Sequence, residues 1–367
     1  MKQSIYLIIL YTGILILLSC KKFNDPPIAI GYRIPESSTD GIAVDDAAKH
    51  GMKKEYLAAL TNHTRTDAFK GIHSVLVLKN DTLIYEEYFN GYDKNTLHNL
   101  YSASKSFTSI LTGIAIDKGA LKLSDPVLPW FPEYAPVSNN SPSKQAVTVS
   151  NLLTMSSGLA CNDQDPSSPG QDNNIYKQDD VLKYLWNLPM ENAPGTTPSY
   201  CSGGVITLAA LISKSTHTTY TDFAEQTILT PLEIYDYTWN FRNIDKTDRP
   251  DEIFLRPRDM GKFGLLILHK GLWGNQQIVS EQWINESTTK KVFLKGFDYG
   301  YLWWLRTITI KGQTMPLISA EGNGGQFIFI LPTLNMVMVS TGGNIDSPLS
   351  GQGFSILYDF IIPAALN

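Results

Sequence analysis

Two expected strand hairpins lie near opposite ends of the 367-residue sequence, with helical and loop patterns between them. Residues 74–79 and 82–89 are rich in apolar and β-branched side chains and flank Asn80-Asp81, a pair typical of tight hairpin turns. Residues 326–331 and 336–340 form the second expected hairpin. Because isolated hairpins cannot bury their apolar faces, we predict one sheet assembled from both ends of the chain, with a helical insertion.

The remaining patterns place helices around this sheet. Helical spacing is expected at 52–66, 257–270, 280–290 and from 354 onward, and in the middle at 181–188, 204–215 and 220–229, with a further strand at 301–310. We therefore predict an α+β fold, with an antiparallel sheet flanked by helices and a mostly helical second lobe. The expected sheet lobe covers 45–115 and 251–367, the inserted lobe covers 116–250, and a site between them is the natural expectation.

The most informative short motif is Ser102-Ala103-Ser104-Lys105. In a helix, positions three apart share a face, so the Lys105 amine can reach the Ser102 hydroxyl and accept its proton. Apolar residues recur at helical spacing from 107 to 115, so Ser102 is expected to open a buried helix whose free N–H groups favour negative charge. Three other serine–lysine pairs have the same spacing, but their contexts do not favour a catalytic role. Ser19–Lys22 lies in the targeting segment, Ser141–Lys144 in a loop and Ser287–Lys290 near the end of an expected surface helix.

The N-terminal segment predicts export. Lys2 precedes an apolar run over 5–18 that is short for a membrane span and typical of a secretory signal. Leu17-Leu18-Ser19-Cys20 resembles the cleavage site of bacterial lipoproteins, in which the cysteine becomes the lipidated first residue; an ordinary signal peptide or an uncleaved anchor is the alternative. We expect a signal at 1–20, a tether at 21–44, and an exported protein lipid-anchored on the periplasmic side of the bacterial envelope.

Charge and composition argue against several other classes. A net charge of −5 gives no electrostatic reason to expect nucleic acid or an anionic membrane surface as a partner. The six histidines show no ligand spacing, and the acidic loop 163–172 lacks the order of a calcium loop and is interpreted as solvated. We therefore expect no metal and no cofactor, and a small molecule or peptide as the substrate.

Cys20 apart, the sequence holds two cysteines, Cys161 and Cys201. A pair in an exported protein permits a disulfide, and two buried free thiols are the alternative. Cys201 directly follows Tyr200, so a bridge would join the segment after Tyr200 to the loop that begins at Cys161.

Several stretches match, in order, the motifs of one enzyme family. They are Tyr101-Ser-Ala-Ser-Lys-Ser-Phe-Thr108, Gly119-Ala-Leu-Lys-Leu-Ser-Asp-Pro126, Val147-Thr-Val-Ser-Asn-Leu-Leu-Thr-Met-Ser-Ser-Gly-Leu159, Pro194-Gly-Thr-Thr-Pro-Ser-Tyr200, Arg258-Asp-Met-Gly-Lys-Phe-Gly264 and Tyr299-Gly-Tyr-Leu-Trp-Trp304. The chain, from about residue 79 to 364, resembles the serine hydrolases that include class C β-lactamases, penicillin-binding DD-peptidases and related esterases. The resemblance implies a β-lactamase/transpeptidase-like fold.

The resemblance also implies residue roles: Ser102 as nucleophile, Lys105 as its proton acceptor and Tyr200 as a second acid or base. A tyrosine with an ordinary pKa near ~10 acts as a base only if nearby cations stabilise its phenolate, which Lys105 could do. Which of Lys105 and Tyr200 takes the first proton stays open. The implied oxyanion hole consists of the backbone N–H groups of Ser102 and Gln326.

Two family motifs are altered. The second, often Tyr-x-Asn, is Tyr200-Cys201-Ser202, and serine lacks the amide that would contact a substrate amide. The third, Lys/His-x-Gly, maps to Asn323-Gly324-Gly325, so an uncharged residue replaces the base that helps relatives bind a substrate carboxylate. Glu321 would oppose an anion if it faced the cleft. The alternative is that Asn323 only shapes the turn.

These patterns predict a serine hydrolase that acts through an acyl-enzyme on an ester or small amide. We expect β-lactams and D-Ala-D-Ala termini to be poor substrates, because the third motif lacks a positive charge. A DD-peptidase or β-lactamase is the closest alternative. A non-catalytic lipoprotein that binds peptidoglycan or peptides is another, favoured by Ser202 and Asn323 and opposed by the joint presence of Ser102, Lys105 and Tyr200.

Overall fold

A nine-stranded sheet is the centre of the computed structural model, which describes residues 31–240 and 252–366. Its strands run in the order β1-β3-β2-β14-β13-β12-β11-β10-β9. As expected, both ends of the chain contribute: β1 (Ala43–Val44), β2 (Ile72–Lys79), β3 (Thr82–Tyr88), β9 (Val292–Leu294), β10 (Phe297–Tyr299), β11 (Trp304–Ile310), β12 (Gln313–Gly322), β13 (Gln326–Leu331) and β14 (Met336–Gly342).

The sheet is mixed, where the sequence predicted an antiparallel one. All other neighbouring strands are antiparallel, but β1 pairs parallel to β3 through Ala43↔Thr82 and Val44↔Leu83. A two-residue edge strand carries no periodicity, so it could not be recognised within the segment expected to be a tether. The turn between β2 and β3 follows the prediction, since Asn80 and Asp81 both have the positive φ of a type I′ hairpin, 50° and 63°.

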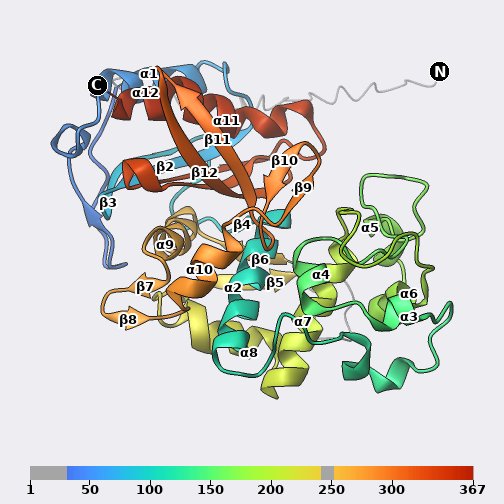
Figure 1. Cartoon of the computed structure of the whole chain (residues 1–367). Coiled ribbons are helices and arrows are strands. Elements are labelled where there is room, and N and C mark those ends of the chain that lie inside the picture. Colours follow the sequence, from blue (N-terminus) through green and yellow to red (C-terminus); the bar gives the residue numbers. More distant parts are fainter. Residues whose placement is uncertain (1–30, 241–251, 367) are drawn as a thin grey trace, which may run out of the picture. The chain divides into compact units, whose positions relative to one another are not determined.

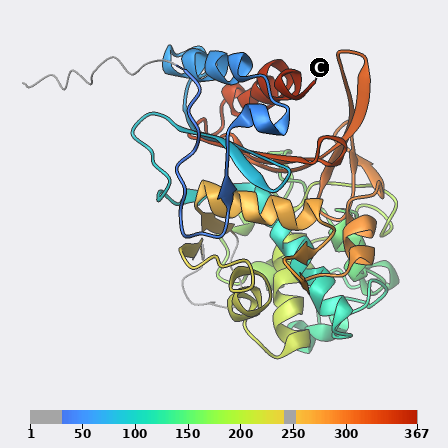
Figure 2. The same ribbon diagram turned by 90° about the vertical axis from the view of Figure 1, so that its left-hand side faces the viewer.

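Helices cover both faces of the sheet (Figures 1 and 2). On one face, the buried side chains of α1 (Lys54–Arg65), α11 (Gln352–Ile356), a π-helical turn (Leu357–Ile361) and α12 (Ile362–Ala365) share an apolar core with β2, β13 and β14. On the other face, α9 (Pro257–Leu268) and α2 (Ser104–Asp117) join a second core that continues into the helical part of the chain.

The helical part is built around α7 (Ser202–Thr216). This helix packs against α2 and against three shorter helices: α4 (Val149–Leu153), α6 (Val181–Asn187) and α8 (Tyr220–Ala224). The lobe boundaries expected from the sequence stay predictions. Besides short 3₁₀ turns, the described residues also form α3 (Pro142–Gln145), α5 (Asp172–Ile175), a π-helical turn (Glu225–Leu229) and α10 (Glu281–Ser287). Two small sheets complete the fold: β4 (His98–Asn99) with β6 (Glu252–Leu255) and β5 (Tyr237–Asn240), and β7 (Leu272–Trp273) with β8 (Gln276–Gln277).

Among the described residues, none of the helices combines the length and apolar character needed to cross a bilayer. The apolar run at 5–18 and the candidate lipidation residue Cys20 lie outside the described residues.

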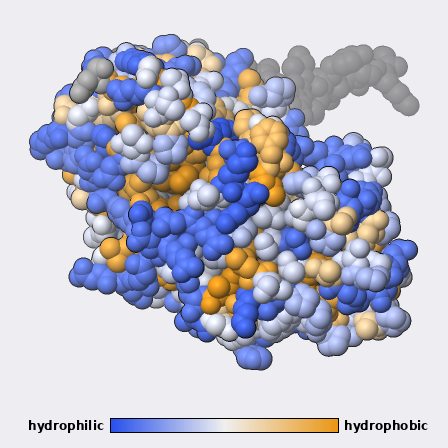
Figure 3. Space-filling view, viewed as in Figure 1, coloured by the Kyte–Doolittle hydropathy of each residue, from blue (hydrophilic) through white to orange (hydrophobic). Residues whose placement is uncertain are grey.

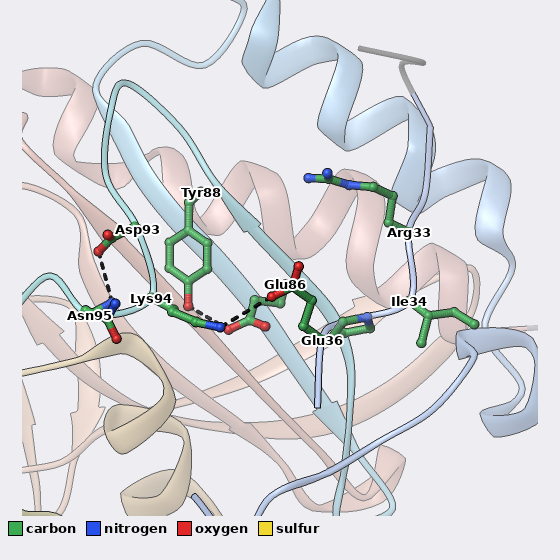
Figure 4. A pocket seen from close by; sticks show the side chains of 9 residues that line it. Arg33, Ile34, Glu36, Glu86, Tyr88, Asp93, Lys94 and Asn95 are labelled. Atoms are coloured by element: carbon green, nitrogen blue, oxygen red, sulfur yellow. Dashed lines mark hydrogen bonds and ion pairs between the residues drawn. The ribbon is translucent and has the colours of Figure 1, made fainter. Parts of the chain in front are cut away.

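Arg258 on α9 ties the N-terminal segment to the sheet. Its guanidinium donates to both carboxylate oxygens of Glu86 on β3 at 2.7 and 2.5 Å, and to Asp40 at 2.9 Å. A further bond at 2.7 Å goes to the backbone carbonyl of Glu36. The side chains of Arg258 and Glu86 are only 5% and 6% exposed. Figure 4 shows Glu86 and Glu36 at the adjacent pocket of about 310 Å³, where the Tyr88 hydroxyl also donates to Glu86.

We predict that Arg258→Met lowers the free energy of unfolding by about 3–5 kcal/mol, because it leaves buried carboxylates without their cation. Urea unfolding of the two proteins measures the difference. The control is Lys270→Met, since Lys270 and Glu281 form an ion pair that is more than half exposed on both sides, where water screens the charges and its loss should change the stability little. Equal losses in the two variants would contradict the prediction.

Candidate active site

Ser102 and Lys105 are in contact. The Lys105 Nζ donates to the Ser102 Oγ at 2.9 Å, and the lysine is buried, with 8% of its surface exposed. The sequence predicted that Ser102 opens the helix itself. In the structure Ser102 lies in the 3₁₀ turn Tyr101–Ala103 and α2 begins at Ser104, so the two residues still project from one continuous helical segment.

The turn that carries Ser102 is held in an unusual conformation. Tyr101 has a φ of 47°, a left-handed value that costs a non-glycine residue about 1–3 kcal/mol and persists only where the surroundings impose it. Here the Asn99 side chain accepts a bond from the Tyr101 N–H at 2.9 Å, and the Leu100 N–H donates to the Ile253 carbonyl at 3.0 Å. The Ser104 hydroxyl accepts from the Ile253 N–H at 3.1 Å. Strands β4 and β6 thus fix the backbone on both sides of Ser102.

Tyr200 lies beside the serine–lysine pair. The Lys105 Nζ is 5.2 Å from the centre of the Tyr200 ring, and the ring stacks on Trp304 with the ring centres 5.9 Å apart. Tyr200 comes two residues before α7 and is buried. The structure therefore brings together the three residues that the sequence singled out for proton transfer.

Ser202 is bound to a carboxylate that the sequence analysis missed. Asp163 Oδ2 accepts bonds from the Ser202 N–H at 2.9 Å and the Ser202 Oγ at 2.7 Å, while the Asp163 N–H donates to the Tyr200 carbonyl at 2.9 Å. Burial raises the pKa of Asp163 to about 6, against the opposing effects of Lys105 and Ser202. The interpretation of loop 163–172 as solvated is therefore wrong at its first residue, although Asp165 is exposed.

A disulfide joins Cys161 to Cys201, with their Cα atoms 5.5 Å apart. Of the two alternatives left open by the sequence, the structure has the bridge. It connects the loop that carries Asp163 to the residue that follows Tyr200, so it fixes both sides of the contact between Asp163 and Ser202.

Asn323 in the third motif is bonded to a neighbouring loop. Its amide Nδ2 donates to Asp346 Oδ1 at 2.7 Å, and the Asp346 N–H donates to Asn323 Oδ1 at 3.0 Å. Both polar ends of the side chain are thus used to shape the turn, which was the alternative interpretation. Gly324 and Gly325 have φ of 84° and 101°, values that side-chain-bearing residues rarely adopt.

The strand end before this turn lies directly against the turn that carries Ser102. A Cβ atom on Gly322 would collide with the Leu100 carbonyl, two residues before Ser102. Gly322 pairs with Gln326 across the turn, and the side-chain Nε2 of Gln326 donates to the Gly342 carbonyl at 2.5 Å. The oxyanion hole of Ser102 and Gln326 N–H groups stays a prediction. Glu321 forms an ion pair with Arg306, which balances its charge within the sheet.

Lys295 is a second cation at Tyr200 that the sequence analysis missed. It forms the turn between β9 and β10 with a φ of 52°, and its Nζ lies 3.9 Å from the Tyr200 ring centre. Burial of the ammonium and the nearby Lys105 lower the pKa of Lys295 to about 8, while Asp163 and Glu321 oppose this shift. No sequence pattern links a hairpin turn to a tyrosine almost a hundred residues earlier.

Tyr200 and Lys295 line a polar pocket of about 370 Å³. The other lining residues come from two loops and from β9: Asn162, Gln164, Asp165, Ser167, Ser168, Pro169, Glu191, Asn192, Thr197, Pro198, Ser199 and Leu294. The β9–β10 hairpin beside it exposes Phe293 and Phe297, and Figure 3 shows hydrophobic surface over this hairpin next to polar surface. Within residues 31–240 and 252–366, no group of three or more His, Cys, Asp or Glu side chains is arranged to hold a metal ion.

Comparison with known proteins identifies the family. The model of the family described as Beta-lactamase matches residues 58–341, which is most of the chain. A 6-aminohexanoate-dimer hydrolase of Paenarthrobacter ureafaciens is 24% identical over 337 residues, covering 86% of this chain and 81% of the relative. Esterase EstB of Burkholderia gladioli is 28% identical over 152 residues, covering 39% and 38% of the two chains.

The fold agrees with this assignment. The crystal structure of a putative β-lactamase from Bacteroides dorei superposes with a TM-score of 0.68 at 16% identity, covering 86% of this chain and 99% of that one. The predicted β-lactamase/transpeptidase-like α+β fold is thus confirmed. The chain belongs to the Beta-lactamase family, a group of serine hydrolases that act on amides and esters.

We predict that replacing both Cys161 and Cys201 by serine lowers the free energy of unfolding by about 4 kcal/mol, because the bridge restricts the unfolded chain across a sequence separation of 40 residues. Denaturant unfolding with and without a reducing agent measures this. Reduction should bring the native protein to the stability of the double variant and leave that variant unchanged. A native protein insensitive to reduction and equal to the double variant would contradict the prediction.

We also predict that Asp163→Asn raises stability at pH 8 by about 1–3 kcal/mol. The folded-state pKa of about 6 lies above the ordinary 3.8, so the folded protein holds more protons between these values and loses stability as the pH rises through them. Asparagine still accepts bonds from Ser202 but has no charge to bury. Urea unfolding at pH 4 to 8 measures the effect.

The control for this prediction is Asp165→Asn, in the same loop. Asp165 is exposed, and bonds from Ser167 lower its pKa, so no gain in stability at pH 8 is expected from its removal. A stability difference between the Asp163 variant and the native protein that does not change with pH would show that burial of this charge is not the cause.

Proposed function

We propose that this protein is an exported, lipid-anchored serine hydrolase that cleaves an ester or small amide through an acyl-enzyme on Ser102. The observation that carries the proposal is the 2.9 Å bond from the Lys105 Nζ to the Ser102 Oγ, with Tyr200 adjacent. A lysine in this position can accept the serine proton when neutral, and the serine oxygen can then attack a carbonyl.

The reaction proceeds by two acyl transfers. The Ser102 Oγ bonds to the substrate carbonyl carbon while its proton passes to Lys105 or Tyr200, and the carbonyl oxygen becomes an oxyanion between two backbone N–H groups. The tetrahedral intermediate then expels the alcohol or amine, which takes up that proton. Water next attacks the acyl-enzyme, releases the acid and returns a proton to Ser102.

Three observations favour an ester or small amide over a β-lactam. Asn323, at the position of the basic residue in the third motif, carries no charge, and its side chain is already hydrogen-bonded to Asp346. The Ser202 hydroxyl donates to the Asp163 carboxylate. The relative aligned over most of this chain is named a 6-aminohexanoate-dimer hydrolase, and another is named an esterase. A DD-peptidase or β-lactamase with the same nucleophile is the alternative.

The disulfide supports an exported location, because such bridges persist in oxidising compartments and are rare in the cytosol. An anchor at Cys20 would hold the enzyme on the periplasmic side of the envelope.

We predict that Ser102→Ala, in the protein beginning at Lys21, lowers hydrolysis of 4-nitrophenyl acetate by at least about 10³-fold. Release of 4-nitrophenolate measures the rate, and mass spectrometry of the quenched native enzyme should find an acyl group on the peptide that contains Ser102. Equal background rates in the two proteins would remove the hydrolase proposal. Faster turnover of a chromogenic cephalosporin than of the ester would favour the β-lactamase alternative.

The matched control is Ser141→Ala, which alters a serine with the same spacing to a lysine. Its partner, Lys144, donates instead to the carbonyls of Ser138, Trp186 and Leu188, and Ser141 caps α3. This motif is structural, so the variant should hydrolyse the ester at the native rate.

A further inference from the structure

Lys295 differs from the other lysines around its hairpin. Lys290 forms an ion pair with Asp298 at 2.6 Å, and Lys291 forms one with Glu286 at 3.4 Å. Within residues 31–240 and 252–366, the Lys295 ammonium has neither an ion pair nor a hydrogen bond and lies over the rings of Tyr200 and Trp304, 3.9 and 5.9 Å from their centres. The stacked aromatic rings therefore hold this cation at the wall of the pocket.

Three carboxylates around Lys295, those of Asp163, Glu321 and Asp165, are bonded to other groups, whereas Glu191 lines the same pocket as an exposed side chain. Asp163 accepts two bonds from Ser202, Glu321 is paired with Arg306, and Asp165 accepts bonds from Ser167 in its own loop. The other charged or titratable groups that face the ammonium or share its pocket are Lys105, Tyr200 and Glu191. An ammonium with no anion of its own, facing a pocket, is suited to receive one from a ligand.

We propose that Lys295 recognises a carboxylate on the substrate, so that this enzyme prefers esters or amides that carry a negative charge near the scissile bond. The inference rests on the proposed hydrolase function and names its substrate class. Asn323 cannot supply this attraction, since it is uncharged and bonded to Asp346. The positive charge comes instead from the β9–β10 turn, on the side of Tyr200 that lines the pocket.

The pH dependence of this preference follows from the titration of Lys295. With a pKa of about 8 the side chain is mostly protonated at pH 7 and mostly neutral at pH 9. The preference for an anionic substrate should therefore be present below pH 8 and fall as the pH rises through 8. The substrate carboxylates stay ionised across this range, so they do not contribute to the change.

Two substrate pairs test the proposal by the ratio of kcat/KM values within each pair. In the first pair, mono-4-nitrophenyl glutarate carries a carboxylate on its acyl group and 4-nitrophenyl butyrate is the neutral ester. In the second pair, 4-acetoxybenzoate carries the carboxylate on its leaving group and phenyl acetate is the neutral ester. We expect the native enzyme to favour the anionic member of at least one pair. Lys295→Met should reduce that ratio by about 10-fold, and Lys295→Arg should preserve it, including at pH 9.

The neutral substrates separate this inference from the proposed function. Lys290→Met, which removes a lysine close to the same turn, should leave both ratios unchanged. A preference that persists in Lys295→Met, or no preference in the native enzyme for either anionic substrate, would overturn the inference alone. Ester hydrolysis that survives Ser102→Ala would overturn the proposed function itself.

Discussion

The close approach of Gly322 to the Leu100 carbonyl sets the geometry of the whole candidate site. It is the point where the end of β12 contacts the turn that carries Ser102. Any side chain at this glycine would push the strand away from the turn. Because Tyr101 is held in a left-handed conformation by Asn99, the turn has little freedom to adjust. The hydrogen bond from the Tyr101 N–H to Asn99 and the absence of a side chain at Gly322 thus fix the position of the Ser102 turn against the end of β12.

The sequence predicted the parts of the fold that depend on local pattern. The two hairpins appear where the apolar and β-branched runs predicted them, with Asn80-Asp81 at the turn of the first, and the helices around them match within a few residues. Strand β12 was missed, since Gln313–Gly322 contains a proline and lacks a clean alternation, and edge strand β1 was too short to recognise. These elements owe their conformation to the neighbours they pair with, which no local pattern encodes.

The site divides in the same way. Ser102 and Lys105 are close in sequence, so helical geometry alone predicts their contact. Asp163 and Lys295 reach Tyr200 from loops distant in sequence, and an acid in a polar loop or a lysine in a hairpin turn is usually solvated. Only the packed structure shows that Asp163 is bonded to Ser202 and that the Lys295 ammonium, on a side chain that is itself exposed, lies over the Tyr200 ring. The signal and anchor expected around Cys20 stay predictions of the sequence.

The two altered motifs share one physical consequence, which is that charge enters the site from new positions. Ser202 donates to the carboxylate of Asp163, and Asn323 is neutral and bonded to Asp346, while the Lys295 ammonium lies over the Tyr200 ring at the pocket. Burial disfavours both charges, raising the pKa of Asp163 to about 6 and lowering that of Lys295 to about 8. Only between these values are both groups mainly ionised. A hydrolase that depends on this pair would therefore be confined to near-neutral pH by the site itself, before the titration of Lys105 or Tyr200 is considered.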